Sequence, residues 1–293
     1  MNFEASTYLL LLLALFGTSF QSAHAQEPVI FNAAGFANVQ QAVKDFQDFL
    51  GGMDNGNEPG PIDDGFRSIN WDAAAVPFDM PGNFFRDTVT RGILLSVKGD
   101  EFRVSNPAKD DPGFPDNLFD SINPQYPKQF QAFSPERIFS PLTHNVFTAE
   151  FSIPGSPKND EAWIAGFGAI FVDVDNEKVS SIEYFDPEGK SLGSFPVVAD
   201  PQGLSFLGVY FPDDVVGSVE VTLGNAILGV DDFPPEHEVV VMDDFFFSEP
   251  VALKKPAEKP AEKPAKSPGL TVTTTPAPPT KSPSPPSGPG YDR

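Results

Sequence analysis

The amino-acid sequence predicts an all-β protein, an antiparallel β-sandwich of jelly-roll type with one short N-terminal helix and a Pro-rich C-terminal tail. Three observations lead to this fold class. Apolar and polar residues alternate with a period of two over much of residues 60–250, as in half-buried strands. Clusters of Pro, Gly and Asp separate these segments. Helical patterns that could connect parallel strands are missing, which excludes a parallel α/β sheet.

The predicted helix covers Ala37–Leu50. Its apolar residues Val39, Val43 and Phe46 recur at helical spacing, and Gly51-Gly52 follows directly. Glycine readily ends a helix because it adopts positive φ without steric cost.

About ten strands are predicted after this helix. Their ranges are Gly65–Asn70, Gly92–Val97, Glu101–Ser105, Val146–Ile153, Ala162–Val174, Lys178–Phe185, Ser191–Val197, Leu204–Phe211, Val216–Leu223 and Glu238–Phe247. The segment Met80–Ser140 is rich in both Pro and Phe, so we expect it to form long ordered loops packed over one end or one face of the sandwich.

Both ends of the chain differ in composition from this domain. Residues 1–25 are typical of a signal peptide, with the apolar run Tyr8–Phe16 and the small-residue motif Ala23-His24-Ala25. The alternative is an uncleaved membrane anchor, although the run is short for a bilayer. We therefore expect a secreted protein with no membrane span after cleavage. The tail, residues 251–293, repeats Lys-Pro-Ala-Glu and continues with Thr, Ser and Pro, a composition typical of disorder. Residues 26–250 then form one domain, which we expect to be a monomer.

The domain is strongly acidic. The whole chain has 19 basic and 41 acidic residues, of which the tail holds seven basic and three acidic and the signal peptide one acidic, so residues 26–250 carry 12 against 37. A net charge of −25 from these counts repels nucleic acid and anionic lipid, and it attracts divalent cations or basic partners. The alternative is that the charge serves only solubility.

Two acidic pairs are candidate metal ligands. Asp243 and Asp244 lie inside the apolar segment Val239–Pro250, where side chains of a regular strand alternate between faces, so at least one is expected to be buried. Asp173 and Asp175 share one face of another strand. Strand ends can bring such oxygens together, and calcium prefers them as ligands. We therefore predict a calcium site formed by all four; the alternative is that Asp173 and Asp175 are solvated. The acidic residues of 54–64 are either a further ion loop or a polar turn after the helix.

One cluster around a tryptophan is the candidate ligand site. Arg67, Trp71 and Asp72 offer a donor, an aromatic ring and an acceptor within six positions, as glycan-binding surfaces do. The alternative is that Trp71 belongs to the core and Arg67 is an ion-paired neighbour. Trp163 begins an apolar strand, so we expect it in the core.

Catalytic residues are not assigned. Chain positions 26–293 contain two histidines, His144 and His237, outside any zinc-ligand spacing, and no cysteine or nucleophile motif is present. A glycosidase needs only two carboxylates, so a glycoside-acting enzyme stays an alternative.

Several sequence segments together resemble a known family. They are Ser68–Asp72, Gln129–Arg137, Gly166–Asp175, Ile182–Asp186, Leu204–Gly208 and Met242–Phe245. They resemble uncharacterised exported bacterial β-sandwich domains that often accompany Pro-Glu-Pro sorting signals and are similar in outline to jelly-roll carbohydrate-binding modules. Here Ser248-Glu-Pro250 is followed by no apolar helix, so membrane sorting by that route is not expected.

These observations favour a secreted, non-catalytic binding module for a glycan or another extracellular polymer, stabilised by calcium. The alternative from another class is an acidic extracellular matrix protein that associates with mineral.

Overall fold

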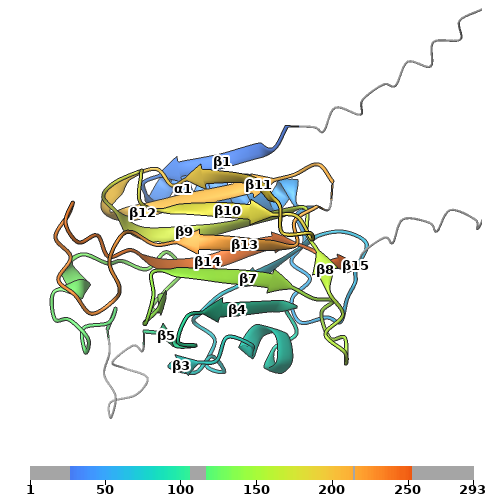
Figure 1. The fold of residues 1–293 in the computed structure, drawn as a ribbon, viewed down its shortest axis with the longest axis horizontal. Helices are drawn as coiled ribbons and strands as arrows, with labels where there is room; N and C mark the ends of the chain where they lie inside the picture. The colour runs from blue at the N-terminus through green and yellow to red at the C-terminus, as the bar shows by residue number, and fades with distance from the viewer. Residues whose placement is uncertain (1–26, 106–116, 214, 253–293) are drawn as a thin grey trace, which may run out of the picture. The chain divides into compact units, whose positions relative to one another are not determined.

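The computed structural model describes residues 27–105, 117–213 and 215–252. The chain divides into two units, residues 1–253 and 254–293, and the described residues all belong to the first. The predicted signal peptide, and the tail from residue 253 onward, lie outside the described residues. The first unit is an antiparallel β-sandwich, so the predicted fold class is confirmed (Figure 1).

Eight strands form the larger sheet. In spatial order seven of them are β1 (Val29–Ala34), β12 (Asp200–Tyr210), β9 (Gly166–Val174), β14 (Val241–Ser248), β6 (Phe139–Pro141), β5 (Phe102–Val104) and β3 (Asp79–Met80), and β2 (Phe66–Ile69) pairs with β14. The smaller sheet has the order β11 (Ser191–Pro196), β10 (Ser181–Phe185), β13 (Ser218–Thr222), β7 (Val146–Phe151) and β4 (Ile93–Val97). A short separate ladder joins β8 (Ala162–Trp163) to β15 (Val251–Ala252).

Helical structure is sparse in the described residues. Helix α1 covers Phe36–Phe49, close to the predicted range, and buries Val39, Val43 and Phe46. A π-helical turn covers Phe84–Thr88 and a 3-10 turn covers Tyr126–Lys128. None of these helices is long and apolar enough to cross a membrane.

Two hydrophobic cores hold the sandwich together. The first fills the space between the two sheets and contains residues such as Trp71, Phe139 and Phe245. The second lies on the other face of the larger sheet, where α1 and loop residues such as Phe119 and Tyr126 cover it. The Pro-rich segment Met80–Ser140 contributes Phe119 and Tyr126 to this second core, whereas its residues Phe84 and Phe102 lie in the first.

Strands between the two cores are buried on both faces. Every residue of β9 and β14 is buried, which explains their nearly continuous apolar sequences. By contrast, β13 faces solvent on one side, so Val219 and Val221 are buried while Glu220 between them is partly exposed.

Helix α1 approaches the larger sheet at a pair of glycines. Gly168 of β9 and Gly208 of β12 are direct partners in the ladder, and the Phe46 ring lies over them. A Cβ atom added to Gly168 would stand 2.9 Å from a ring carbon of Phe46. The glycines therefore set the depth at which the helix packs.

Candidate functional site

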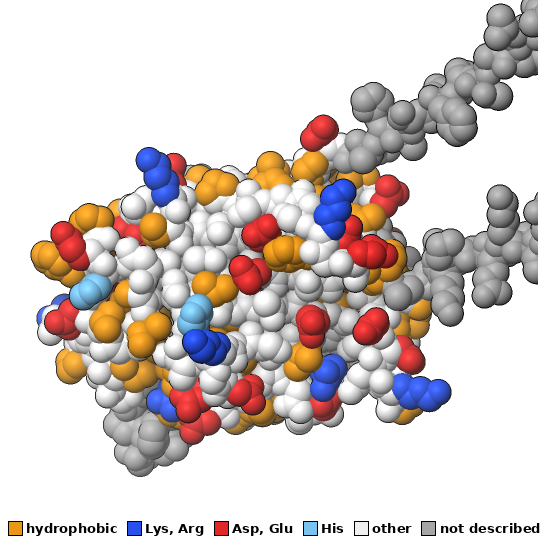
Figure 2. All heavy atoms as spheres, in the orientation of Figure 1, with side chains coloured by type: hydrophobic (Ala, Val, Ile, Leu, Met, Phe, Trp, Pro, Cys, Tyr) orange, Lys and Arg blue, Asp and Glu red, His pale blue; other side chains and the backbone are white. Residues whose placement is uncertain are grey.

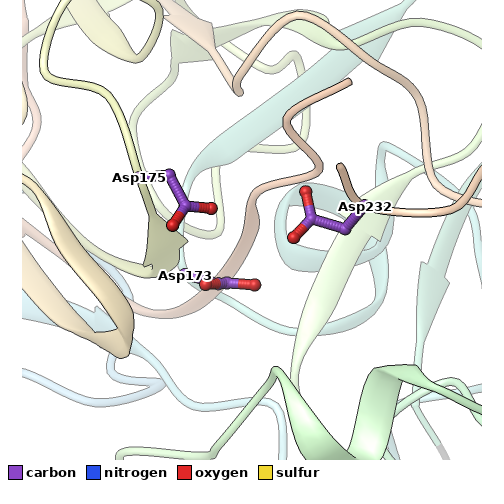
Figure 3. Close-up of side chains that lie close together, drawn as sticks. All are labelled: Asp173, Asp175 and Asp232. Carbon is purple, nitrogen blue, oxygen red and sulfur yellow. The ribbon is translucent and has the colours of Figure 1, made fainter. Parts of the chain in front are cut away.

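Three aspartates converge at one end of β9. Asp173, Asp175 and Asp232 each offer a carboxylate oxygen, and these oxygens all lie within 4.8 Å of one another. Asp173 belongs to β9, Asp175 follows its last residue, and Asp232 comes from the loop before β14. Their carboxylates point toward a shared space (Figure 3). Asp173 is buried, the other two are partly exposed, and the group could hold a metal ion.

A break in the ladder orients Asp173. The register between β9 and β12 shifts between Asp200 and Leu204, opposite Asp173, whose φ is 65°. Asp adopts this left-handed conformation more easily than most residues. The Oδ1 atom of Asp173 accepts the backbone N–H of Gln202 at 2.6 Å, while the buried Oδ2 atom has no hydrogen-bond partner.

Asp232 is fixed by two donors. Its Oδ1 accepts the Val239 N–H at 2.9 Å, and its Oδ2 accepts from Nε2 of Gln129 at 3.1 Å. The amide oxygen of the same Gln129 is buried without a partner.

Glu238 adds a fourth carboxylate beside this group. It is fully buried, and its Oε1 accepts the backbone N–H groups of Asp175 and Asn176, each at 3.2 Å. Its Oε2 atom has no partner. An unpartnered buried carboxylate oxygen costs stability, so these oxygens are suited to a cation.

Burial and mutual repulsion disfavour the charged forms of these acids. Burial, aided by the charges of Asp232, Asp175 and Glu238, raises the pKa of Asp173 to about 7. Burial is also the main cause that raises the pKa values of Asp175, Asp232 and Glu238. The ion pairs found among the described residues involve none of these four acids.

Asp243 and Asp244 do not belong to this group, so the predicted four-aspartate calcium site is wrong in that half. Met242 pairs with Phe171 and Phe245 with Ala169, which leaves the two aspartates opposite one residue in a β-bulge. A bulge removes the regular alternation of faces on which the prediction depended. Both side chains instead reach the Ser134 hydroxyl.

Ser134 lies among three carboxylates. Its Oγ atom is 2.8 Å from Oδ2 of Asp72, 3.2 Å from Oδ1 of Asp243 and 3.1 Å from Oδ1 of Asp244. One hydroxyl carries one proton, so it can donate to only one of them at a time. Burial raises the pKa of Asp244 to about 6 and that of Asp243 well above its ordinary value.

The predicted ligand site of Arg67, Trp71 and Asp72 is wrong because its aromatic ring is inaccessible. Trp71 is 0% exposed and stacks on Phe139 with a centroid distance of 4.2 Å. Its Nε1–H donates to the Asp243 carbonyl at 3.0 Å. The alternative assignment to the core is the correct one for Trp71.

Arg67 is likewise fully buried. It is ion-paired, as the alternative proposed, and its partner is Glu249. Asp72 accepts from the Ser134 hydroxyl and from the Arg137 N–H. The polar-turn alternative also fits the stretch after α1, where Asp54 accepts from the Gly56 N–H.

Trp163 is the tryptophan that reaches solvent. It is partly exposed and lines a cleft of about 510 Å³ and a second of about 420 Å³. Both clefts also contain Asp186, Pro187 and Glu188. The expectation that Trp163 lies in the core is wrong, because β8 pairs only with the short β15 at the end of the sandwich.

Sequence reasoning missed Asp232, Glu238 and the accessibility of Trp163. Asp231-Asp232 repeats the acidic doublet of Asp243-Asp244 and lies in the loop before the same strand, a signal that could have drawn attention to Asp232. No protein-family model matches the chain, and no curated protein is similar to it.

Proposed function

We propose that this protein is a secreted, non-catalytic binding module for an extracellular polymer, stabilised by one calcium ion. The observation that carries the calcium assignment is the convergence of Asp173, Asp175 and Asp232 together with the partnerless buried oxygens of Asp173 and Glu238. The N-terminal apolar run and the resemblance to exported sandwich domains support secretion.

The donor set favours calcium over softer metals. All candidate ligands are carboxylate or amide oxygens, and neither histidine nor cysteine belongs to the group. Hard cations such as Ca²⁺ take six to eight oxygen ligands, some from water, whereas zinc prefers nitrogen and sulfur. The ion would join the end of β9 to the loop before β14 and so fasten one end of the larger sheet.

Thermal unfolding with and without calcium tests the site. At a calcium concentration of about 100 times Kd, binding to the native state alone raises the free energy of unfolding by about 2.7 kcal/mol. We expect this gain in the natural protein and its loss in Asp232→Asn. Asp231→Asn is the matched control. It removes the same charge from the neighbouring residue, which does not belong to the group. Equal melting temperatures of the natural protein in calcium and in EDTA would contradict the proposal.

One observation favours the mineral-associated matrix protein as a second candidate. On the solvent face of the smaller sheet, Glu183 of β10 stands directly opposite Glu220 of β13, and Thr148 of β7 continues the same row. Like charges that face each other across strands are destabilising unless a cation lies between them. Figure 2 shows one face of the molecule, on which acidic side chains lie among hydrophobic, basic and uncharged polar ones.

Adsorption to calcium carbonate separates the two candidates. A matrix protein binds the mineral through this row, so the double variant Glu183→Gln/Glu220→Gln would lose adsorption. A binding module for organic polymer would show no adsorption that depends on these two residues.

A further inference from the structure

The cleft beside Trp163 is lined by strands of the smaller sheet and by the turn at Asp186. Leu94, Glu150 and Ser218 are direct cross-strand partners on β4, β7 and β13, and together they line the floor on the solvent side of the smaller sheet. Trp163 and the turn at Asp186 also line the cleft. A flat sheet beside an aromatic side chain is a surface on which an extended chain can lie.

Trp163 is held in place by strands on both sides. It pairs with Val251 of β15, and the next residue, Ile164, exchanges two backbone hydrogen bonds of 3.0 Å with Val216. A side chain on a tethered strand presents its ring with little loss of conformational entropy on binding.

The charges of the cleft restrict its ligand. Glu150, Glu161, Asp186 and Glu188 supply four carboxylates. The one lining arginine, Arg86, already binds Asp87 through two hydrogen bonds of 2.7 and 3.0 Å. The resulting negative field repels uronic acids, sulfated sugars and nucleic acid, whereas carboxylates accept hydrogen bonds from sugar hydroxyl or amino groups.

We propose that this cleft binds an oligosaccharide of neutral or amino sugars, with the apolar face of one sugar ring packed on Trp163. This inference rests on the proposed function as a polymer-binding module, and it adds the place of the binding site and the class of ligand. The clefts of about 510 and 420 Å³ share Trp163, Asp186, Pro187 and Glu188, so they adjoin and extend past the indole. Each lies within the range of small-molecule sites, about 300 to 1,000 Å³, and together they suit a chain of several sugars.

The cleft and the calcium site can be tested separately. Gly166 begins β9 close to Trp163, and Asp173 follows seven residues later on the same strand. At about 3.3 Å per residue the two sites are roughly 23 Å apart along β9. A change in one is thus expected to leave the other intact.

Tryptophan fluorescence gives a direct readout of the cleft. The chain contains two tryptophans, and Trp71 is 0% exposed, so acrylamide quenching reports Trp163. The probes are hexasaccharides of glucose, mannose, xylose, N-acetylglucosamine and glucosamine, with hexagalacturonate as the acidic comparison and hexalysine as a basic peptide. We expect at least one neutral or amino-sugar hexamer to protect Trp163 from quenching and hexagalacturonate to have no effect.

Titration calorimetry with the protecting hexamer then tests the residues. Trp163→Ala is expected to weaken binding at least tenfold. Glu150→Ala changes an exposed residue outside β8, so it does not disturb the strand that carries Trp163, and it is expected to weaken binding at least threefold. The control Phe233→Ala removes a ring that is 66% exposed in another loop and leaves binding unchanged. Trp163→Ala keeps the calcium-induced rise in melting temperature, whereas Asp232→Asn keeps sugar binding below its melting temperature.

Three results overturn the proposal. In the first, none of the five neutral or amino-sugar hexamers protects Trp163 from quenching. In the second, only hexagalacturonate or only hexalysine protects it. In the third, Trp163→Ala and Glu150→Ala both bind the hexamer with unchanged affinity. If the sugar experiments fail while calcium still raises the melting temperature, the calcium site is retained and only the sugar-binding cleft is refuted.

Discussion

Arg67 and Glu249 form a two-pronged ion pair inside the protein: Nε and Nη2 of the guanidinium donate to the two carboxylate oxygens at 2.7 and 2.8 Å. Both residues are buried. The remaining nitrogen, Nη1, donates to the carbonyls of Gly56 and Thr90 at 2.9 and 3.0 Å. One side chain thus joins β2, the loop after α1, the segment before β4 and the end of β14.

Breaking this pair is expected to destabilise the protein strongly. Glu249→Ala leaves a buried guanidinium without its counter-charge, a loss of about 3–5 kcal/mol in the free energy of unfolding. Urea denaturation measures it. Asp48→Ala, which breaks the exposed ion pair with Lys44, is the control and is expected to lower the free energy of unfolding far less. A cost for Glu249→Ala no larger than for the control would show that the pair contributes little.

Packing of α1 depends on the glycine pair beneath Phe46. Gly168→Ala forces the ring and the neighbouring strand apart, and overpacking of this kind costs about 1–3 kcal/mol. Gly189→Ala is a useful comparison, since nothing lies within 4 Å of its added Cβ, although its φ of 79° carries its own strain. Shortening Phe46 to Leu in the Gly168→Ala background should recover part of the loss. If Phe46→Leu recovers none of the lost stability, the strain does not arise at the Phe46 ring.

Asp244 makes stability depend on pH. Burial raises the pKa of Asp244 to about 6 in the folded protein, above the ordinary value of 3.8, so the folded state holds a proton that the unfolded state releases. This stabilisation is complete below about pH 4 and is lost as the pH rises through 6. Melting temperatures in EDTA between pH 4 and 7 should fall less in Asp244→Asn than in the natural protein. Parallel curves for the two proteins would refute the assignment.

Glu238 is expected to act as a calcium ligand or to orient one. Its unpartnered Oε2 lies in a fully buried side chain next to the aspartate group, so Glu238→Gln should weaken calcium binding about 10- to 100-fold. Titration calorimetry measures this change. Glu236→Gln, at an exposed position two residues earlier, should leave the affinity as it is. A loss of the same size in Glu236→Gln would indicate a general effect of charge.

The sequence predicted the class of fold because alternation and turn residues are local signals. Nine of the ten expected strands are present with ends that differ by a few residues, and the tenth, Ala162–Val174, divides into β8 and β9, which belong to different sheets. The strands β1, β3, β6 and β15 were missed: β3 and β15 have two residues each and β6 has three, too few to show a period. The six residues of β1, Val-Ile-Phe-Asn-Ala-Ala, are only partly buried at the sheet edge and alternate weakly.

Site residues were harder to predict because their neighbours are distant in sequence. Asp173 and Asp175 were found from their spacing, but Asp232 meets them only through the loop before β14. The bulge at Asp243 and Asp244 has no signature in the amino-acid types. Trp71 was a ligand candidate with the core as its alternative, and Trp163 was expected in the core. The residues that pack on Trp71 and pair with Trp163 lie far from them in the sequence, so local patterns could not decide either case.

The position of β14 has a consequence for the time at which the protein can fold. This strand lies between β9 and β6 and also carries β2, yet it is nearly the last element of the chain; Ile69 finds its partner in Phe245, 176 positions later. A chain that emerges from the ribosome, or from an export channel, with its N-terminus first cannot complete the larger sheet until almost all of it has passed. Completion of the larger sheet therefore waits for one of its last strands, so its folding depends on contacts between residues that lie far apart in the sequence.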